Sequence, residues 1–355
     1  MHVANRCAAA VRPNYDVFLN FNGVDTRNGF THHLYNALVA AKFSVFKDDP
    51  DLLGEQIGPG LLQAIAYSKI AIAVISGNYA SSEWCLRELT EIVKCGKADQ
   101  RKLILPIFYD VDVSDVYNQT GEFGKGFSEL AKHHTPEQVE EWREALRSVA
   151  RIKGWSSRDV ADGRLVDMVV EKVSSILSPP WIEQIPMFRK KRKKSKCEVF
   201  PLSSPATKKT FASHLPYHLE RENISVFRDD DQYLIGKDVD REVRNAMDHC
   251  KIFIPIISED FASSHDCLDK LVQMFKCVEE NGQKILPVFY EVDLSRKKEL
   301  RDHFWTDMLR HDVPERLVNG GSNLSIGFFL SQDLYRKTSG MEGNSRMWCA
   351  NMLSD

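Results

Sequence analysis

Short, almost wholly apolar segments recur along the first half of the chain, and segments with helical periodicity separate them. Ile70–Ile75 is an unbroken apolar run, and Leu103–Phe108 is nearly one. Tyr15–Phe21 and Phe43–Phe46 are predicted to be two further strands, and Gly154-Trp155 a short fifth one. Strands that are apolar on both faces are typical of a parallel sheet covered by helices on both sides. The pattern predicts an α/β domain with a flavodoxin-like, five-stranded parallel sheet in the order 2-1-3-4-5.

The segments between the predicted strands carry apolar residues at helical spacing, which predicts amphipathic helices. The residues that we expect on their apolar sides are Phe30, Leu34, Leu38 and Val39; Leu61, Leu62, Ile65 and Ala66; Trp142, Ala145, Leu146 and Val149; and Leu165, Val169 and Val173.

A distinctive motif, Ser81–Leu89, follows the apolar run Ile70–Ile75. A helix is predicted to begin at its two serines, whose hydroxyls can cap the first free N–H groups. Trp84 and Glu88 are four residues apart and therefore share one helix face, where we expect Glu88 to be partly exposed. Ligands of open α/β sheets bind at the carboxyl ends of the strands, so this pair is a candidate site. The alternative interpretation is a half-buried aromatic anchor beside a solvated charge.

Composition narrows the class of protein. A length of 355 residues is typical of about two domains, and 43% apolar with 27% charged residues is typical of soluble globular proteins. The net charge of −3 argues neither for nor against nucleic acid, and we expect no nucleic-acid partner. No apolar run approaches the roughly 20 residues of a membrane helix, so we expect no membrane partner. The first residues do not resemble a secretory signal. Eight cysteines without C-x-x-C spacing predict free thiols in a reducing compartment, and hence a cytoplasmic or nuclear protein.

The second half of the chain repeats the first. Lys69–Ser76 returns as Lys251–Ser258, and Leu105–Asp112 returns as Leu286–Asp293. Repetition of this kind predicts two tandem domains of one fold. Beyond His303 the chain has no counterpart of Trp142 or Trp155, so we expect the second copy to be degenerate and incomplete at its C-terminus.

These observations predict a division of the chain into an N-terminal tail (1–14), a first domain (15–178), a proline-containing and basic linker (179–196), a degenerate second domain (197–302) and a divergent C-terminal tail (303–355). The linker ends in the basic run Arg189–Lys196. Dense like charges remain solvated, so the run is either a nuclear-import signal, a weak nucleic-acid patch or a simple spacer.

Three motifs of the first half resemble plant TIR (Toll/interleukin-1 receptor) domains: Tyr15–Arg27, Asn78–Leu89, and Phe108–Val116 followed by Gln119-Thr120-Gly121. The resemblance covers about residues 15–178, and residues 197–300 show a weaker form of it. It implies the flavodoxin-like TIR fold, a role in plant immune signalling, and self-association with the same or other TIR domains.

The resemblance also implies an activity, cleavage of the nicotinamide–ribose bond of NAD, which would be a substrate and not a prosthetic group. It assigns the catalytic role to Glu88. The residues that it assigns to NAD binding are Phe21, Asn22, Gly23, Asp25 and Trp84. A carboxylate can stabilise the oxocarbenium character that develops on the ribose, and an indole face can stack on a cationic pyridinium.

Some residues depart from the usual TIR pattern. Asn22 stands where the family usually has Arg, Val24 where it has Glu, and His32-His33 where it tends to have Ser-His. Two functions therefore stay open: an NAD nucleosidase that acts when self-associated, and a non-catalytic scaffold that binds other TIR proteins.

The second copy departs further. Asp266 stands at the position of Trp84 and Lys270 at that of Glu88, and Pro205 replaces the glycine of the first turn. A cation repels a developing oxocarbenium ion, so this copy is predicted to be catalytically silent.

Other site types find little support in the sequence. No P-loop motif or leucine-rich period occurs, so the chain resembles a TIR-only protein or a fragment. The histidines show no ligand spacing, and no metal is predicted. Cys85, Cys95, Cys267 and Cys277 recur between the copies and are expected to be small packing residues.

Overall fold

The computed structural model describes residues 15–47, 59–99, 101–177, 197–208, 211–229, 231, 234–261 and 263–291. The chain divides into two compact units, one ending at Lys191 and one beginning at Arg192, with Asp231–Asp240 grouped with the first. The predicted tails 1–14 and 303–355, and the linker 179–196 with its basic run, lie outside the described residues.

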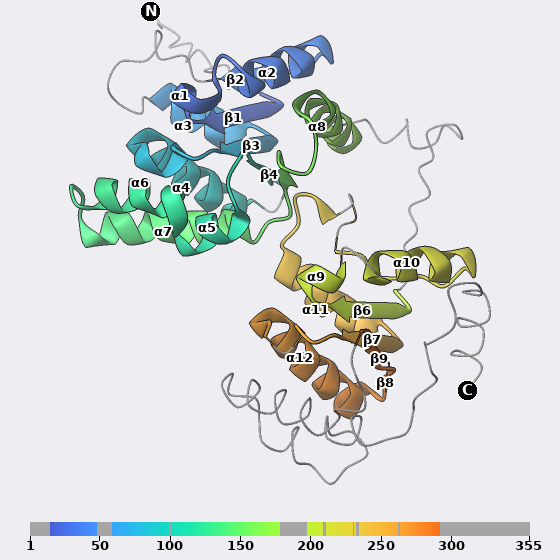
Figure 1. Ribbon diagram of the computed structural model, residues 1–355. Coiled ribbons are helices and arrows are strands. Elements are labelled where there is room, and N and C mark those ends of the chain that lie inside the picture. Colours follow the sequence, from blue (N-terminus) through green and yellow to red (C-terminus); the bar gives the residue numbers. More distant parts are fainter. Residues whose placement is uncertain are drawn as a thin grey trace, which may run out of the picture. The chain divides into compact units, whose positions relative to one another are not determined.

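The first unit is built on a five-stranded parallel sheet (Figure 1). Its strands are β1 (Val17–Phe21), β2 (Val45–Lys47), β3 (Ile70–Ile75), β4 (Leu103–Phe108) and β5 (Trp155–Ser156). They lie in the order β2-β1-β3-β4-β5, and every pair is parallel. The predicted flavodoxin-like topology is confirmed.

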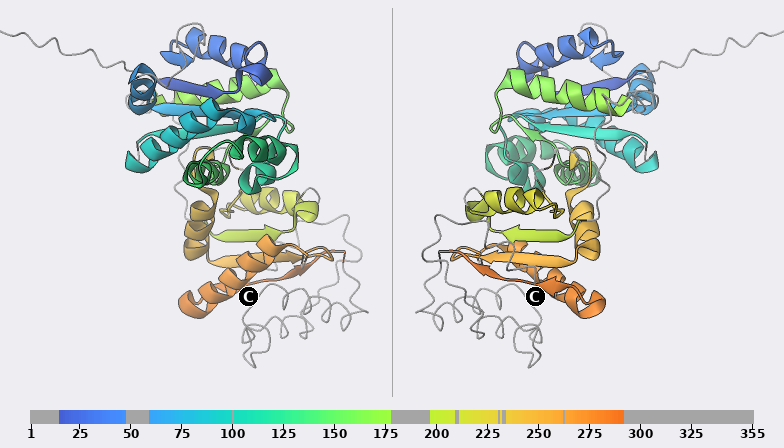
Figure 2. Two further views of the ribbon diagram at one scale, coloured as in Figure 1. Left: turned by 90° about the vertical axis from the view of Figure 1, so that its left-hand side faces the viewer. Right: turned by 90° about the vertical axis from the view of Figure 1, so that its right-hand side faces the viewer.

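Helices cover both faces of this sheet (Figure 1; Figure 2). They are α1 (Gly23–Thr26), α2 (Phe30–Ala40), α3 (Pro59–Tyr67), the 3₁₀ turn η1 (Tyr79–Ser81), α4 (Glu83–Ala98), α5 (Val113–Asn118), α6 (Gly121–Ala131), α7 (Pro136–Ala150) and α8 (Asp162–Leu177). Residues of α2 and α8 form the core on one face, and residues of α3 to α7 form it on the other. Three residues that were expected on apolar sides are exposed, Val39, Leu62 and Ala66, because each lies next to the buried stripe of its helix and not on it.

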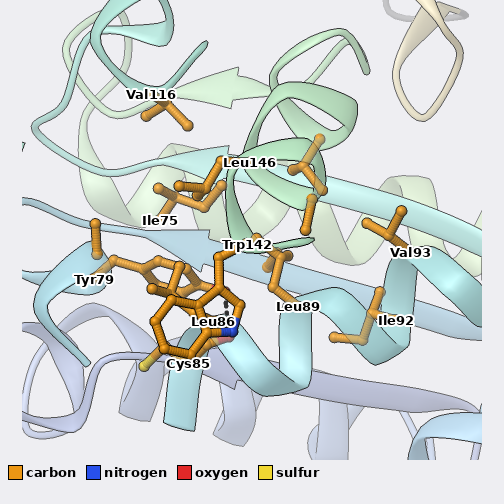
Figure 3. Packing of buried hydrophobic residues seen from close by; sticks show 14 of the residues in the cluster. Ile75, Tyr79, Cys85, Leu86, Leu89, Ile92, Val93, Val116, Trp142 and Leu146 are labelled. Carbon is orange, nitrogen blue, oxygen red and sulfur yellow. Dashed lines mark hydrogen bonds between the residues drawn. The ribbon is translucent and has the colours of Figure 1, made fainter. Parts of the chain in front are cut away.

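Helix α4 begins where the sequence predicts. The Ser82 hydroxyl accepts from the Cys85 N–H and caps the helix. Its apolar residues, Leu86, Leu89 and Ile92, are fully buried in one cluster with β3 and α7 (Figure 3). Burial of each such side chain stabilises a fold by about 1.5–3 kcal/mol, which fixes α4 on this face of the sheet, with its first turn following the carboxyl end of β3.

The second unit repeats part of this plan. Its elements are β6 (Val199–Ser203), α9 (Pro205–Lys208), α10 (Phe211–Arg221), α11 (Val239–His249), β7 (Ile252–Ile257), α12 (His265–Asn281), β8 (Lys284–Ile285) and β9 (Val288–Phe289). β6, β8 and β9 all pair with β7 in parallel. The equivalent of β2 is reduced to a single bridge between Val199 and Val226, and the equivalent of β4 is divided between β8 and β9. This is a second, degenerate copy of the fold.

Cys197 and Cys250 form a disulfide, so the prediction that every cysteine is a free thiol is wrong for this pair. The register of the sheet explains the pairing. Val199 of β6 pairs with Ile252 of β7, and each cysteine lies two residues before its strand residue, which brings their Cα atoms to 5.1 Å. Cys85, Cys267 and Cys277 are buried free thiols, which agrees with their expected packing role, whereas Cys95 is a free thiol that is only partly buried.

Among the described helices, none has the combination of length and apolarity that crossing a membrane requires.

Candidate functional site

The carboxylate of Glu88 lies inside the first unit. Glu88 is only 5% exposed, which corrects the expectation of a partly exposed side chain, whereas Trp84 one turn earlier is 41% exposed. The Asn20 Nδ2 amide of β1 donates to Glu88 Oε2 over 2.9 Å. The buried leucines of α4 pack against the sheet and hold the helix there. The Glu88 carboxylate therefore contacts β1 at Asn20, one residue before the strand ends.

Asn20 is itself held by a second buried group. The Tyr79 hydroxyl donates to Asn20 Oδ1 and lies 3.2 Å from the carbonyl oxygen of Cys85. Burial, and after it the neighbouring Cys85 and Glu88 groups, raise the pKa of Tyr79 well above its usual range. The Tyr79 hydroxyl therefore stays protonated and donates to the amide oxygen of Asn20. This fixes the orientation of the amide, so that its N–H₂ group is directed at the Glu88 carboxylate.

Asn20 and Tyr79 were missed by sequence reasoning. A signal for Asn20 was present, since it is the one polar residue in the strand Val17–Phe21, and Asn is depleted in strands. No comparable signal marks Tyr79, which is read most simply as an aromatic core residue.

The segment after β1, which includes the short helix α1, holds three of the residues assigned to NAD binding, and two of these, Asn22 and Asp25, bond to the loop after β3. Asn22 Oδ1 accepts from the Val24 N–H over 2.9 Å, and Asn22 Nδ2 donates to the Asn78 carbonyl over 2.8 Å. Asp25 accepts from the Asn78 backbone N–H at 2.9 Å and from Asn78 Nδ2 at 2.8 Å. These bonds tie the loop after β1 to the loop after β3.

Phe21 and Gly23 are placed differently. The ring of Phe21 belongs to the core on the α2 and α8 face, opposite to Glu88, and the guanidinium of Arg27 lies 5.3 Å from its centre. A Cβ atom on Gly23 would come within 2.8 Å of Arg27 Nε, so glycine leaves room for that cation. The structure thus gathers Asn22, Gly23 and Asp25 in one loop, but it does not bring the Phe21 ring to Glu88.

Other chemistry has little support near Glu88. Burial raises the pKa of the Cys85 thiol to about 12, so it is a poor nucleophile at neutral pH. Within the described ranges, no group of three or more His, Cys, Asp or Glu side chains is suited to hold a metal ion.

The second unit lacks the whole polar arrangement. Leu202 occupies the position of Asn20, Phe261 that of Tyr79, and both are buried. Lys270 turns to Asp266 and pairs with it at 2.5 Å. The first turn nevertheless forms with Pro205 in place of glycine, at the first position of α9.

A flavodoxin-like sheet with a carboxylate held at the carboxyl end of its strands defines the class of the first unit. The TIR domain family matches residues 14–198 and again 196–313, which together make up more than half of the chain. The chain belongs to the TIR domain family.

Several plant proteins are similar to the first half. Disease resistance-like protein DSC2 of Arabidopsis thaliana is 43% identical over 165 residues, covering 46% of this chain and 14% of that protein. TMV resistance protein N of Nicotiana glutinosa is 42% identical over 174 residues, covering 48% of this chain and 15% of that protein. The chain thus spans about a seventh of the length of these relatives.

A solved structure is also similar, the TIR domains of the activated Roq1 resistosome directly recognizing the pathogen effector XopQ. It is 38% identical with a TM-score of 0.42, and the match covers 45% of this chain and 99% of that chain.

Proposed function

We propose that this chain is a plant immune-signalling TIR protein whose first unit cleaves the nicotinamide–ribose bond of NAD when TIR domains self-associate. Membership of the TIR family and the names of its relatives, which are disease resistance proteins, support the signalling role. The observation that carries the proposed cleavage is Glu88, a buried carboxylate held by an amide at the carboxyl end of the sheet.

The chemistry of the bond explains why this carboxylate suits it. Loss of nicotinamide leaves positive charge on the ribose, and a nearby fixed carboxylate stabilises that charge most where water is excluded. Trp84 lies one helical turn from Glu88 and keeps 41% of its surface exposed, and an exposed indole can stack on a flat cationic ring.

The burial of Glu88 also bears on self-association. A ribose cannot reach a carboxylate that is 5% exposed without a local rearrangement. We propose that association of TIR domains supplies it, which makes cleavage depend on protein concentration.

The test is incubation of the full chain with NAD over a series of protein concentrations, with free nicotinamide measured by chromatography. We expect release to rise more steeply than in proportion to protein. Glu88→Gln keeps the shape of the side chain and removes its charge, and should abolish release. Glu91→Ala, on the same helix, is the matched control and should leave release unchanged. Equal release from wild type and Glu88→Gln would exclude the proposed role of Glu88.

The scaffold function is favoured by a different observation. Both oxygens of Asp25 and both ends of the Asn22 amide already have hydrogen-bond partners within the loops. A chain that co-purifies with a second, differently tagged copy but releases no nicotinamide at any concentration would identify a scaffold.

A further inference from the structure

We propose that Asn20 and Tyr79 are positioning residues for Glu88: their polar groups hold the carboxylate, and the TIR fold itself does not need them. The catalytic part of this inference rests on the proposed cleavage of NAD. The structural part, that the polar groups serve the carboxylate, can be tested without it.

The geometry forms a single buried chain of hydrogen bonds. Tyr79 donates to Asn20 Oδ1, and Asn20 Nδ2 donates to Glu88 at 2.9 Å. Asn20 and Tyr79 are fully buried, and they are one and two hydrogen bonds removed from the Glu88 carboxylate, so they are placed to act on a reaction through Glu88. A buried carboxylate is costly unless donors satisfy it, and hydrogen bonds to charged groups are stronger than neutral ones.

The second unit shows which of these contacts the fold requires. The helix caps are kept in both copies: the Ser82 hydroxyl accepts from the Cys85 N–H, and the Ser264 hydroxyl accepts from the Cys267 N–H, each at 3.4 Å. The thiol contacts of the two helices with the end of the first strand are also kept, from Cys85 to the Phe21 carbonyl at 3.4 Å and from Cys267 at 3.6 Å.

The polar chain, in contrast, is lost. Leu202 and Phe261 fill the positions of Asn20 and Tyr79 with apolar groups, and both are buried while β6 still pairs with β7. They occur in the copy where Lys270 replaces Glu88. The polar groups of Asn20 and Tyr79 are therefore present where the carboxylate is present and absent where it is absent, although the strand and helix form in both cases.

The first experiment is a double-mutant cycle on the full chain, read by amide hydrogen exchange of peptides from β1 and α4. Asn20→Leu should lower protection about ten- to a hundredfold, because it removes a hydrogen-bond donor from a buried carboxylate. In a Glu88→Met background, the same substitution should lower protection by less than twofold. Tyr79→Phe removes a single oxygen, so it folds even if Asn20→Leu does not, and should show the same dependence on Glu88.

A matched control comes from the same helix. The buried hydroxyl of Thr90 donates to the Leu86 carbonyl at 2.8 Å, and residues two apart on a helix, such as Thr90 and Glu88, do not face each other. Thr90→Val should therefore have the same effect on exchange in both backgrounds. If Asn20→Leu and Tyr79→Phe were also independent of the background, the polar pair would serve the core and the inference would be overturned.

The second experiment reads catalysis. Tyr79→Phe should lower the kcat of nicotinamide release at least tenfold and change KM less than twofold, since the hydroxyl orients the catalytic group and does not contact substrate. Unchanged kcat would refute the positioning role. A wild-type chain that releases no nicotinamide would refute the proposed function and with it the catalytic part, whereas the exchange cycle would still decide whether the pair holds Glu88.

Discussion

The disulfide of the second unit permits a quantitative prediction. The bond joins residues that are 53 positions apart, and it lies at the amino ends of β6 and β7. Opening a loop of that length returns about 14 cal/mol/K of chain entropy to the unfolded state, which is about 4 kcal/mol at 25 °C. Since measured values are often below this entropy limit, we expect reduction to destabilise the second unit by about 2–4 kcal/mol.

Hydrogen exchange on the full chain measures this difference locally. We expect peptides from β6 and β7 to lose protection by between about thirtyfold and a thousandfold when dithiothreitol is added, because about 1.4 kcal/mol corresponds to a factor of ten. The first unit provides an internal control. Tyr15 and Ser68 stand at the positions equivalent to the two cysteines, so β1 and β3 should not respond to the reductant.

A Cys250→Ala variant completes the test. It should exchange like the reduced wild type and show no further response to dithiothreitol. Two outcomes would refute the reasoning: unchanged exchange of β6 and β7 on reduction of the wild type, or rapid alkylation of Cys197 and Cys250 in native protein that was never reduced. In a reducing compartment the two cysteines are thiols. The second unit is then less stable than its disulfide form by the same difference of about 2–4 kcal/mol.

Three further predictions follow from single features. Buried Lys102 donates to two backbone carbonyls, as Gln283 does in the second unit. Burial lowers the pKa of Lys102 below 10.5, so the unfolded chain binds that proton more tightly and the contribution of Lys102 to stability rises as the pH approaches that value. In urea unfolding, the free energy of unfolding of the wild type should therefore rise with pH relative to that of Lys102→Gln, and the two should differ by no more than about 1 kcal/mol at neutral pH. Trp84→Ala should lower nicotinamide release at a cost of about 1 kcal/mol or less in thermal unfolding, because the ring is half-exposed. Deletion of Arg189–Lys196 should shift a fluorescent fusion from nucleus to cytoplasm, and an unchanged distribution would support a spacer.

Topology was the most predictable part of the structure. The apolar runs of β3 and β4 and the serine cap of α4 are local signals, and strand order followed from the class of sheet that they define. The disulfide was not predictable, because it depends on the register between β6 and β7, which no local pattern of the cysteines encodes. The division of the equivalent of β4 into β8 and β9 was not predictable either. Pro287 lies at the break, but its counterpart Pro106 lies within the continuous strand β4, so the proline alone does not signal a break.

The candidate site was predictable to the extent that its residues lie in motifs. The spacing of Trp84 and Glu88 correctly placed both on the first turns of one helix, but it could not show that one is half-exposed and the other buried. That difference arises from the contact of α4 with β1, which joins residues 68 positions apart. Helical periodicity describes which residues share a face, whereas the depth of each on that face depends on how the helix is tilted over the sheet.

The two copies together separate what the fold requires from what a site requires. Both units have apolar strands and a serine-capped helix, α4 or α12, whose cysteine thiol contacts the end of the first strand. Because these features occur in both units, the requirements of folding alone account for them. The buried Asn20 and Tyr79 of the first unit are replaced in the second by the apolar Leu202 and Phe261, and Glu88 is replaced by Lys270, which pairs with Asp266. The sheet forms with either set of residues. A buried polar network is costly when any member is missing, so the network is expected to be gained or lost as a whole. Its complete presence in one unit and complete loss in the other is what a site maintained for function in only one copy would produce.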